Sequence, residues 1–187
     1  IPPKSEAVRE HLEWFMDQKL GLMMHWAPGC QLGTYESWPL SDGDGIWSQE
    51  DMTWADIETC KQQYWDANKT FNPVKFDPEG WARLAAECGF KYLLFTTKHH
   101  DGFCMFDTKT TDYKITAPSC PFHMHRDADI VGALFREFRR QGLGTSVYFS
   151  KPDWHSEYYW PPKTAPAPTR NVNYIISEHP DMWEKFV

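Results

Sequence analysis

The sequence lacks any apolar run long enough to cross a membrane, although 41% of its 187 residues are hydrophobic. A membrane-spanning helix needs about 20 consecutive apolar residues, so we expect no membrane partner. Positive charge is also scarce, with 19 Lys and Arg against 26 Asp and Glu and a formal net charge of -7. Domains that bind nucleic acid cluster basic residues on one face, so we expect no nucleic-acid partner either.

Metal-binding motifs are missing as well. The five cysteines form no Cys-x-x-Cys pair, which argues against a zinc ribbon and predicts isolated thiols. His-Glu-x-x-His does not occur, and His-x-His occurs only at 123–125, in a loop rich in Pro and Cys. We therefore predict no metal and no other cofactor. The disfavoured alternative is a metal-dependent hydrolase that draws its ligands from His99, His100, His123, His125 and His155.

Aromatic residues are abundant instead. Ten Trp, eight Tyr and twelve Phe make up 16% of the chain, and many of them are expected in the core. Some tryptophans lie in stretches rich in Gly, Pro or Asp that are not expected to form core elements, namely Trp26, Trp38, Trp47, Trp154 and Trp160. Flat rings with a polar edge suit ligands that are themselves half apolar, and sugars are such ligands.

The segment 76–97 predicts a helix followed by a strand. Asp77 is a natural N-cap, Pro78 suits the first helical turn, and Gly89 ends the helix. One face of this helix is predicted to carry Trp81, Leu84, Ala85 and Cys88. The apolar residues 91–97 then predict a strand that is rich in strand-forming residues.

The segment 126–150 repeats this order. Asp127 or Asp129 begins a helix that ends at Gly142, and the strand 144–150 follows. The predicted apolar face of the helix consists of Ile130, Val131, Leu134, Phe135 and Phe138. A strand is also predicted at 20–26 and a helix at about 54–64, followed much later by a surface loop at 160–169 and the start of a helix at 177–187. Alternating strands and helices predict the α/β class with a parallel sheet, and the apolar strands predict burial on both faces.

Each predicted strand ends in polar or aromatic residues. These are His25-Trp26 after the first strand, Lys98-His99-His100 after the second, and Tyr148-Phe149-Ser150 with Asp153-Trp154-His155 beyond the third. In parallel α/β folds the functional side chains collect at the carboxyl ends of the strands. The turn Asp101-Gly102 can direct both adjacent histidines toward the same space. We interpret Asp101 as a turn former and not as a nucleophile.

The loop 33–45 adds a carboxylate and an aromatic ring, Glu36 and Trp38, after the first strand. An ordinary turn cluster of Asp and Gly is the alternative interpretation. Neutral imidazoles and carboxylates both hydrogen-bond to hydroxyl groups. The combination of histidines, aromatic rings and Glu36 therefore predicts a site for a polyol or a sugar.

The residues that carry these signals resemble the α-L-fucosidases of glycoside hydrolase family 29. The matching stretches are "KLGLMMHW", "FKYLLFTTKHHDGFCMFDT", "TDYKI", "RDADIVGALFREFRRQGLGTSVYFS", "DWH" and "HPDMWEKFV". The resemblance implies a (β/α)8-like barrel, of which residues 1–187 hold the first three or so βα units. It also implies a secreted or periplasmic protein, or a lysosomal one in a eukaryote.

The resemblance also implies roles for individual residues. His25, His99 and His100 would hydrogen-bond the fucose hydroxyls, and Trp38, Tyr148 and Glu36 would complete the pocket. The family pattern places Glu directly before Trp, whereas Ser37 separates them here.

The resemblance further implies retaining hydrolysis of a fucosylated oligosaccharide or glycoconjugate. The nucleophile and the acid/base residue would lie after Val187, in the remainder of the catalytic domain, which would be a partner of this chain. A non-catalytic fucose-binding protein with the same pocket is the alternative.

Overall fold

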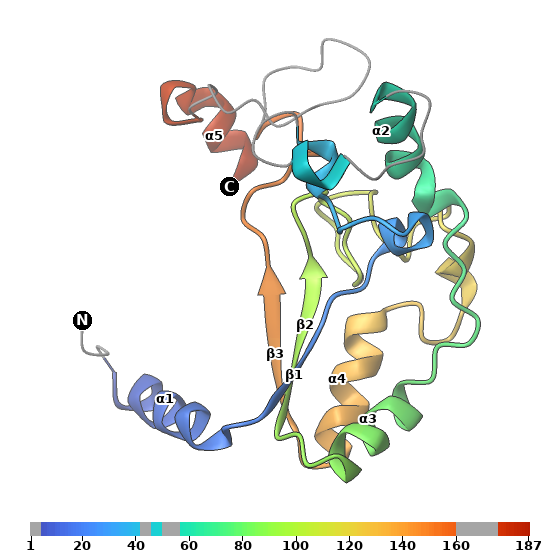
Figure 1. Ribbon diagram of the computed structural model, residues 1–187. Coiled ribbons are helices and arrows are strands. Elements are labelled where there is room, and N and C mark those ends of the chain that lie inside the picture. Colours follow the sequence, from blue (N-terminus) through green and yellow to red (C-terminus); the bar gives the residue numbers. More distant parts are fainter. Residues whose placement is uncertain (1–4, 42–45, 50–56, 160–175) are drawn as a thin grey trace.

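The computed structural model describes residues 5–41, 46–49, 57–159 and 176–187, and it has strands that alternate with helices (Figure 1). The strands are β1 (Gly21–Met24), β2 (Tyr92–Lys98) and β3 (Gly144–Phe149). The α-helices are α1 (Glu6–Gln18), α2 (Ile57–Asp66), α3 (Pro78–Glu87), α4 (Ile130–Arg140) and α5 (Pro180–Phe186). Trp160 and the predicted loop 160–169 lie outside the described residues. None of the described helices has the length and apolarity that crossing a bilayer requires.

The strands form one parallel sheet in the order β1-β2-β3, which confirms the predicted α/β class. Among the described residues the sheet has three strands and does not close into a barrel. The central strand is buried, with Leu93 and Phe95 fully inaccessible. The prediction of burial on both faces is wrong for the outer strands, where Met23 and Val147 are each about half exposed. The reason is that α3 and α4 lie on the same side of the sheet (Figure 1).

Asp77 and Asp129 begin the two helices that pack on the sheet. Asp77 accepts a hydrogen bond from the amide of Gly80, and Asp129 accepts one from the amide of Gly132, both at 2.9 Å. Such caps satisfy amides that have no partner within the helix. The sequence left Asp127 and Asp129 as alternatives for the second cap, and the structure selects Asp129.

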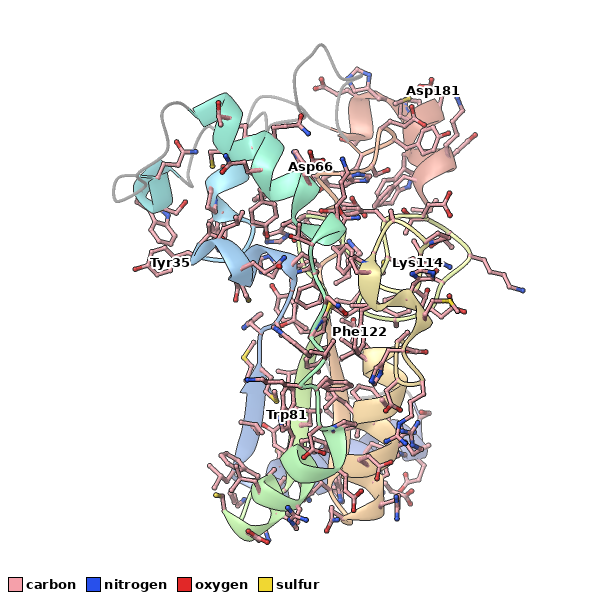
Figure 2. The ribbon with its side chains drawn as sticks, turned by 90° about the vertical axis from the view of Figure 1, so that its right-hand side faces the viewer. Tyr35, Asp66, Trp81, Lys114, Phe122 and Asp181 are labelled. Carbon is pink, nitrogen blue, oxygen red and sulfur yellow. The ribbon has the colours of Figure 1, made fainter. Side chains whose placement is uncertain are left out.

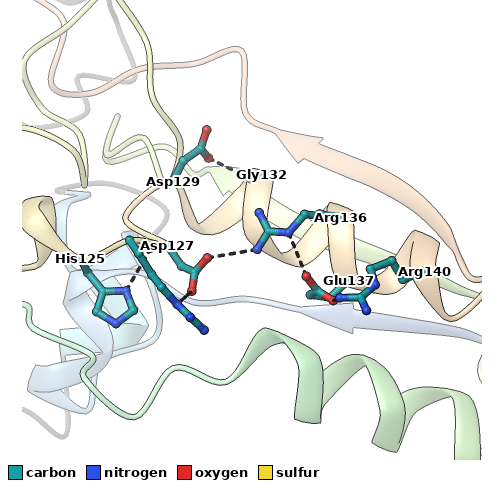
Figure 3. A network of polar contacts seen from close by, with 8 residues as sticks. His125, Asp127, Asp129, Gly132, Arg136, Glu137 and Arg140 are labelled. Atoms are coloured by element: carbon teal, nitrogen blue, oxygen red, sulfur yellow. Dashed lines mark hydrogen bonds and ion pairs between the residues drawn. The ribbon is translucent and has the colours of Figure 1, made fainter.

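Asp127 instead starts a row of ion pairs along α4 (Figure 3). Its carboxylate lies 3.1 Å from Arg136, and Glu137 lies 2.8 Å from Arg136 and 2.9 Å from Arg140. The hydrogen bonds from Arg136 hold the pKa of Glu137 below its usual value. The two buried carboxylates of Asp127 and Glu137 are thereby paired with the exposed guanidinium groups of Arg136 and Arg140.

The apolar face of α4 is the predicted one, since Ile130, Leu134 and Phe138 are fully buried. The prediction for α3 is wrong in part, because Leu84 is 60% exposed and Cys88 is also exposed. Ala85 is buried as predicted, and Ala82, which was not predicted, is buried as well. Helix α3 packs mainly against α4, and Leu84 and Cys88 lie on the side that faces away from the core.

Trp81, labelled in Figure 2, packs at the side of this core. Its ring lies 5.3 Å from that of Trp26 and 5.2 Å from that of Phe76, measured between centroids. The interpretation of Trp26 as a residue outside the core is therefore wrong. The ring of Trp26 is partly buried and packs against the apolar core.

Two further expectations concern the remaining elements. The helix predicted at about 54–64 is α2, which extends to Asp66, and Trp54 lies outside the described residues. The prediction of isolated thiols is confirmed, because none of the five cysteines, all of them in the described ranges, forms a disulfide. The sequence analysis did not predict α1, which Ser5 caps and which has no buried residue.

We expect Leu134 and Leu84 to respond differently to truncation. Leu134→Ala should lower the free energy of unfolding of the intact protein by about 2–5 kcal/mol, because it leaves a cavity in the core. Leu84→Ala should change it by less than about 0.5 kcal/mol, since this side chain is exposed. Urea unfolding followed by circular dichroism measures both values. Equal losses for the two variants would contradict the assignment of the helix faces.

Candidate functional site

The ends of the three strands bring the predicted histidines to one edge of the sheet. His25 follows β1, His99 and His100 follow β2, and Tyr148 lies near the end of β3. The pairing between β2 and β3 shifts register between Thr96 and Lys98. Such bulges redirect the side chains that follow them. The structure therefore provides a reason why both neighbouring histidines reach the same site.

Glu36 connects two of these histidines. One carboxylate oxygen lies 3.1 Å from Nδ1 of His25, and the other lies 2.9 Å from Nε2 of His99. Glu36 has a positive φ of 52°, a conformation that is uncommon for residues other than glycine and that concentrates at functional sites. Burial raises the pKa of Glu36, but the hydrogen bond from His99 and the nearby imidazoles outweigh this effect, so the pKa lies below its usual value.

Ser37 completes the contacts of His99, although the sequence analysis treated it only as an interruption of the family pattern. Its hydroxyl contacts Nδ1 of His99, and both residues are buried. Because the Glu36 carboxylate can only accept, Nε2 of His99 donates to it, while Nδ1 pairs with the Ser37 hydroxyl. The two contacts fix the orientation of the ring. The side chain of Ser37 therefore helps to orient His99.

His100 lies between two tryptophans. Its ring stacks on Trp154 at 4.9 Å and 24°, and Trp38 meets it edge-on at 5.6 Å. The amide of Trp154 donates to the carbonyl of His100 at 2.7 Å. Burial, reinforced by the charges of His99 and Lys98, lowers the pKa of His100 from 6.5 to about 4. His100 is therefore neutral at physiological pH.

Tyr148 forms the wall beside the first two histidines. Its ring stacks on His99 at 5.7 Å and 13°, and it meets His25 edge-on at 5.4 Å. The six predicted pocket residues are therefore connected by direct contacts: His25, Glu36, Trp38, His99, His100 and Tyr148.

Asp101 lies directly after the two histidines but points into the protein. It is 1% exposed and accepts hydrogen bonds from the Tyr64 hydroxyl at 2.8 Å and from the Phe103 amide at 3.1 Å. Burial raises the pKa of Asp101, although these hydrogen bonds oppose the shift. Its interpretation as a turn residue agrees with this geometry. The contact also ties α2 to the turn that carries the histidines.

A second connection between β2 and β3 was not predicted. Nζ of Lys98 is buried and lies 3.4 Å from the Asp153 carboxylate, which also accepts the amides of His155 and Ser156. Gly102 has a φ of 80°, and a Cβ added there would lie 2.4 Å from Asp153. The turn after β2 and the segment after β3 therefore lock together. This ion pair could have been predicted from the sequence, because Lys98 and Asp153 carry opposite charges and each lies near the end of a predicted strand.

A cation could be held by His25, Glu36 and His99. Their ligand atoms lie within 4.8 Å of one another, and no other set in the described part of the chain meets this criterion. The histidines of the metal hypothesis are not gathered at one place, because His123 contacts the carbonyl of Cys120 and His155 stacks on Tyr113. The nitrogen-to-oxygen distances at Glu36 are those of hydrogen bonds. The contacts of His25 and His99 with Glu36 are thus hydrogen bonds.

The chain matches the family model described as alpha-L-fucosidase over residues 2–186. It is 32% identical over 89 residues to alpha-L-fucosidase 1 of Arabidopsis thaliana, which covers 48% of this chain and 17% of that protein.

Two solved structures are also similar to it. Alpha-L-fucosidase isoenzyme 1 from Paenibacillus thiaminolyticus has a TM-score of 0.64 and 33% identity, covering 82% of this chain and 31% of that one. The fucosidase AlfC from Lactobacillus casei, solved in complex with its α-L-fucose product, has a TM-score of 0.61 and 32% identity, covering 80% and 43%. The chain spans less than half the length of each of these proteins. Because the family match covers nearly all of its residues, the chain belongs to the α-L-fucosidase family.

Proposed function

We propose that the intact protein is a retaining α-L-fucosidase that releases terminal fucose from fucosylated oligosaccharides or glycoconjugates. In this proposal the present chain supplies the residues that hold the fucose. The observation that carries it is the arrangement of Glu36 between His25 and His99, with His100 beside them. We also propose that the protein is secreted or periplasmic, or lysosomal in a eukaryote, where glycans are its substrates.

The pocket offers both donors and acceptors for hydrogen bonds with hydroxyl groups. A carboxylate has about four acceptor sites, and the histidines occupy only part of this capacity on Glu36. A neutral imidazole can donate from one nitrogen and accept at the other. Trp38 and Tyr148 add apolar faces at the sides. This combination suits a sugar ring with several hydroxyls and an apolar edge.

Retaining hydrolysis needs two carboxyl groups about 5–5.5 Å apart, one as nucleophile and one as acid/base. Glu36 is held by two histidines, and Asp101 is buried against Tyr64. Neither is placed to attack a sugar. We therefore assign both catalytic carboxylates to the remainder of the catalytic domain, after Val187. A (β/α)8 barrel takes about 250 residues, so the three strands here would be its beginning.

A non-catalytic fucose-binding protein is the second candidate. This candidate is favoured because the contacts described in the pocket can all hold a sugar, and none of these side chains is placed to act as a nucleophile or as an acid/base. The two candidates differ in outcome: the enzyme releases fucose from an aryl α-L-fucoside, whereas the binding protein retains affinity for fucose without releasing it. An intact protein that neither cleaves fucosides nor binds fucose would contradict both.

His99→Ala should lower kcat/KM of the intact protein on an aryl α-L-fucoside. Hydrogen bonds to charged groups contribute about 1.5–3 kcal/mol, which corresponds to a loss of about ten- to a hundredfold. His123→Ala is the matched control, because this ring contacts the carbonyl of Cys120 instead of the pocket. Steady-state kinetics gives both values. An unchanged kcat/KM in His99→Ala would remove this residue from the site.

His100 should titrate with a midpoint at about pH 4 instead of 6.5. Because the unfolded chain binds this proton more tightly, His100 contributes stability that is complete above pH 6.5 and is lost as the pH falls toward 4. Nuclear magnetic resonance of the imidazole protons measures the midpoint, and His100→Gln identifies the signal by its disappearance. A midpoint near 6.5 would show that the ring is not desolvated between the two tryptophans.

Chelation should leave the hydrolysis of the aryl fucoside unchanged, because His25 and His99 use the nitrogens that could bind a metal to hydrogen-bond with Glu36. The measurement compares kcat/KM before and after dialysis against EDTA, with elemental analysis of the same sample. Loss of activity on chelation, with recovery after one equivalent of zinc, would instead support the metal-dependent hydrolase.

A further inference from the structure

Two large aromatic side chains lie exposed beside the pocket. Tyr35 is 61% exposed and Trp47 is 51% exposed, and their ring centroids are 5.5 Å apart. Figure 2 shows Tyr35 pointing away from the body of the protein. Burial in the core of the described chain does not account for either ring. Exposed aromatic groups of this kind commonly mark a binding surface.

The two rings are continuous with the pocket. Trp47 lies 6.4 Å from Trp38, and Trp38 in turn lies 5.6 Å from His100, measured between ring centroids. Tyr35 directly precedes Glu36, whose positive φ sends the carboxylate toward the histidines. A row of aromatic rings therefore leads from His100 through Trp38 to the exposed rings of Trp47 and Tyr35.

The backbone under these rings is held in place. The amide of Trp38 donates to the carbonyl of Tyr35 at 3.2 Å. The side chain of Gln49 donates to the carbonyls of Pro39 at 2.9 Å and Ser41 at 3.1 Å, which ties the segment that carries Trp47 to the segment that carries Trp38. Rings that are positioned before a ligand arrives lose little entropy when they bind it.

We propose that Tyr35 and Trp47 form an aromatic platform that stacks on the sugar to which the fucose is attached. This inference rests on the proposed function, because it places the second sugar of the substrate next to a fucose held by the histidines. A pyranose ring has one face of C–H groups and a polar edge, so it packs on an aromatic ring while its hydroxyls stay in water. The platform would select substrates by the attached sugar and would not touch the fucose itself.

The test compares substrates that do and do not carry a second sugar. Tyr35→Ala, Trp47→Ala and the double variant of the intact protein are assayed with α-L-fucosyl fluoride and with a panel of fucosylated disaccharides. Fluoride leaves without contacting the platform, so the kcat/KM for fucosyl fluoride should not change. For at least one disaccharide, kcat/KM should fall about tenfold or more, mainly through KM. Tyr35→Phe keeps the ring and should retain disaccharide activity, and Met124→Ala, which removes an exposed apolar side chain elsewhere, should change neither activity.

The outcomes separate the platform from the proposed function. Equal losses on both kinds of substrate, or no loss on any disaccharide, would overturn the platform. Equal losses would instead indicate that another part of the protein packs on these rings. If the unaltered protein hydrolyses none of the substrates, the proposed function fails. Calorimetry then measures the affinity for fucose and for the disaccharides and tests whether the platform binds the second sugar. The variants should lose affinity for a disaccharide and keep their affinity for fucose; loss of both or of neither rejects it.

Discussion

The carboxylate of Glu36 connects the ends of two strands that are far apart in the sequence. Glu36 lies on the loop between these strands, and the pocket depends on its contacts with them. His25 comes from the end of β1 and His99 from the end of β2, and each bonds to one oxygen of the carboxylate. Glu36 reaches them only because its backbone adopts a positive φ. The same turn places Ser37 against the other side of His99. Without this carboxylate, the two imidazoles would lose the hydrogen-bonding partner that they share.

The electrostatics of the pocket follow from burial. His100 is desolvated between Trp38 and Trp154, so it stays uncharged and can exchange hydrogen bonds with neutral hydroxyls. The buried ammonium group of Lys98, the residue before His99, is paired with the Asp153 carboxylate. Removing one member of such a buried pair leaves the other uncompensated, at a cost of about 3–5 kcal/mol. The pair therefore holds the turn after β2, which carries His99 and His100, against the segment after β3.

The sequence predicted the parallel α/β sheet and the pocket residues, because both depend on local signals. Alternating apolar runs and caps such as Asp77 identify the elements, and parallel strands place His25, His99 and His100 at one edge. What it did not predict depends on contacts distant in sequence. Leu84 has helical spacing that suits a core position, but α3 packs against α4 with Ala82 and Ala85 on its buried side, so Leu84 is exposed. Ser37 and Asp153 gained their roles only when the chain brought them beside His99 and Lys98. Helix α1 carries Val8, Leu12 and Phe15 at helical spacing after the Ser5 cap, so its signal was present in the sequence, although these side chains are about half exposed.

The central claim is that the strand ends and the loop 34–40 form a pocket for the hydroxyls of one fucose. A crystal structure of the intact protein with bound fucose tests it most directly. The account predicts fucose hydroxyls within hydrogen-bonding distance of Glu36, His25 and His100, with the two catalytic carboxylates on either side of the anomeric carbon. Fucose bound away from these residues, or a cation seated between His25, Glu36 and His99, would contradict it.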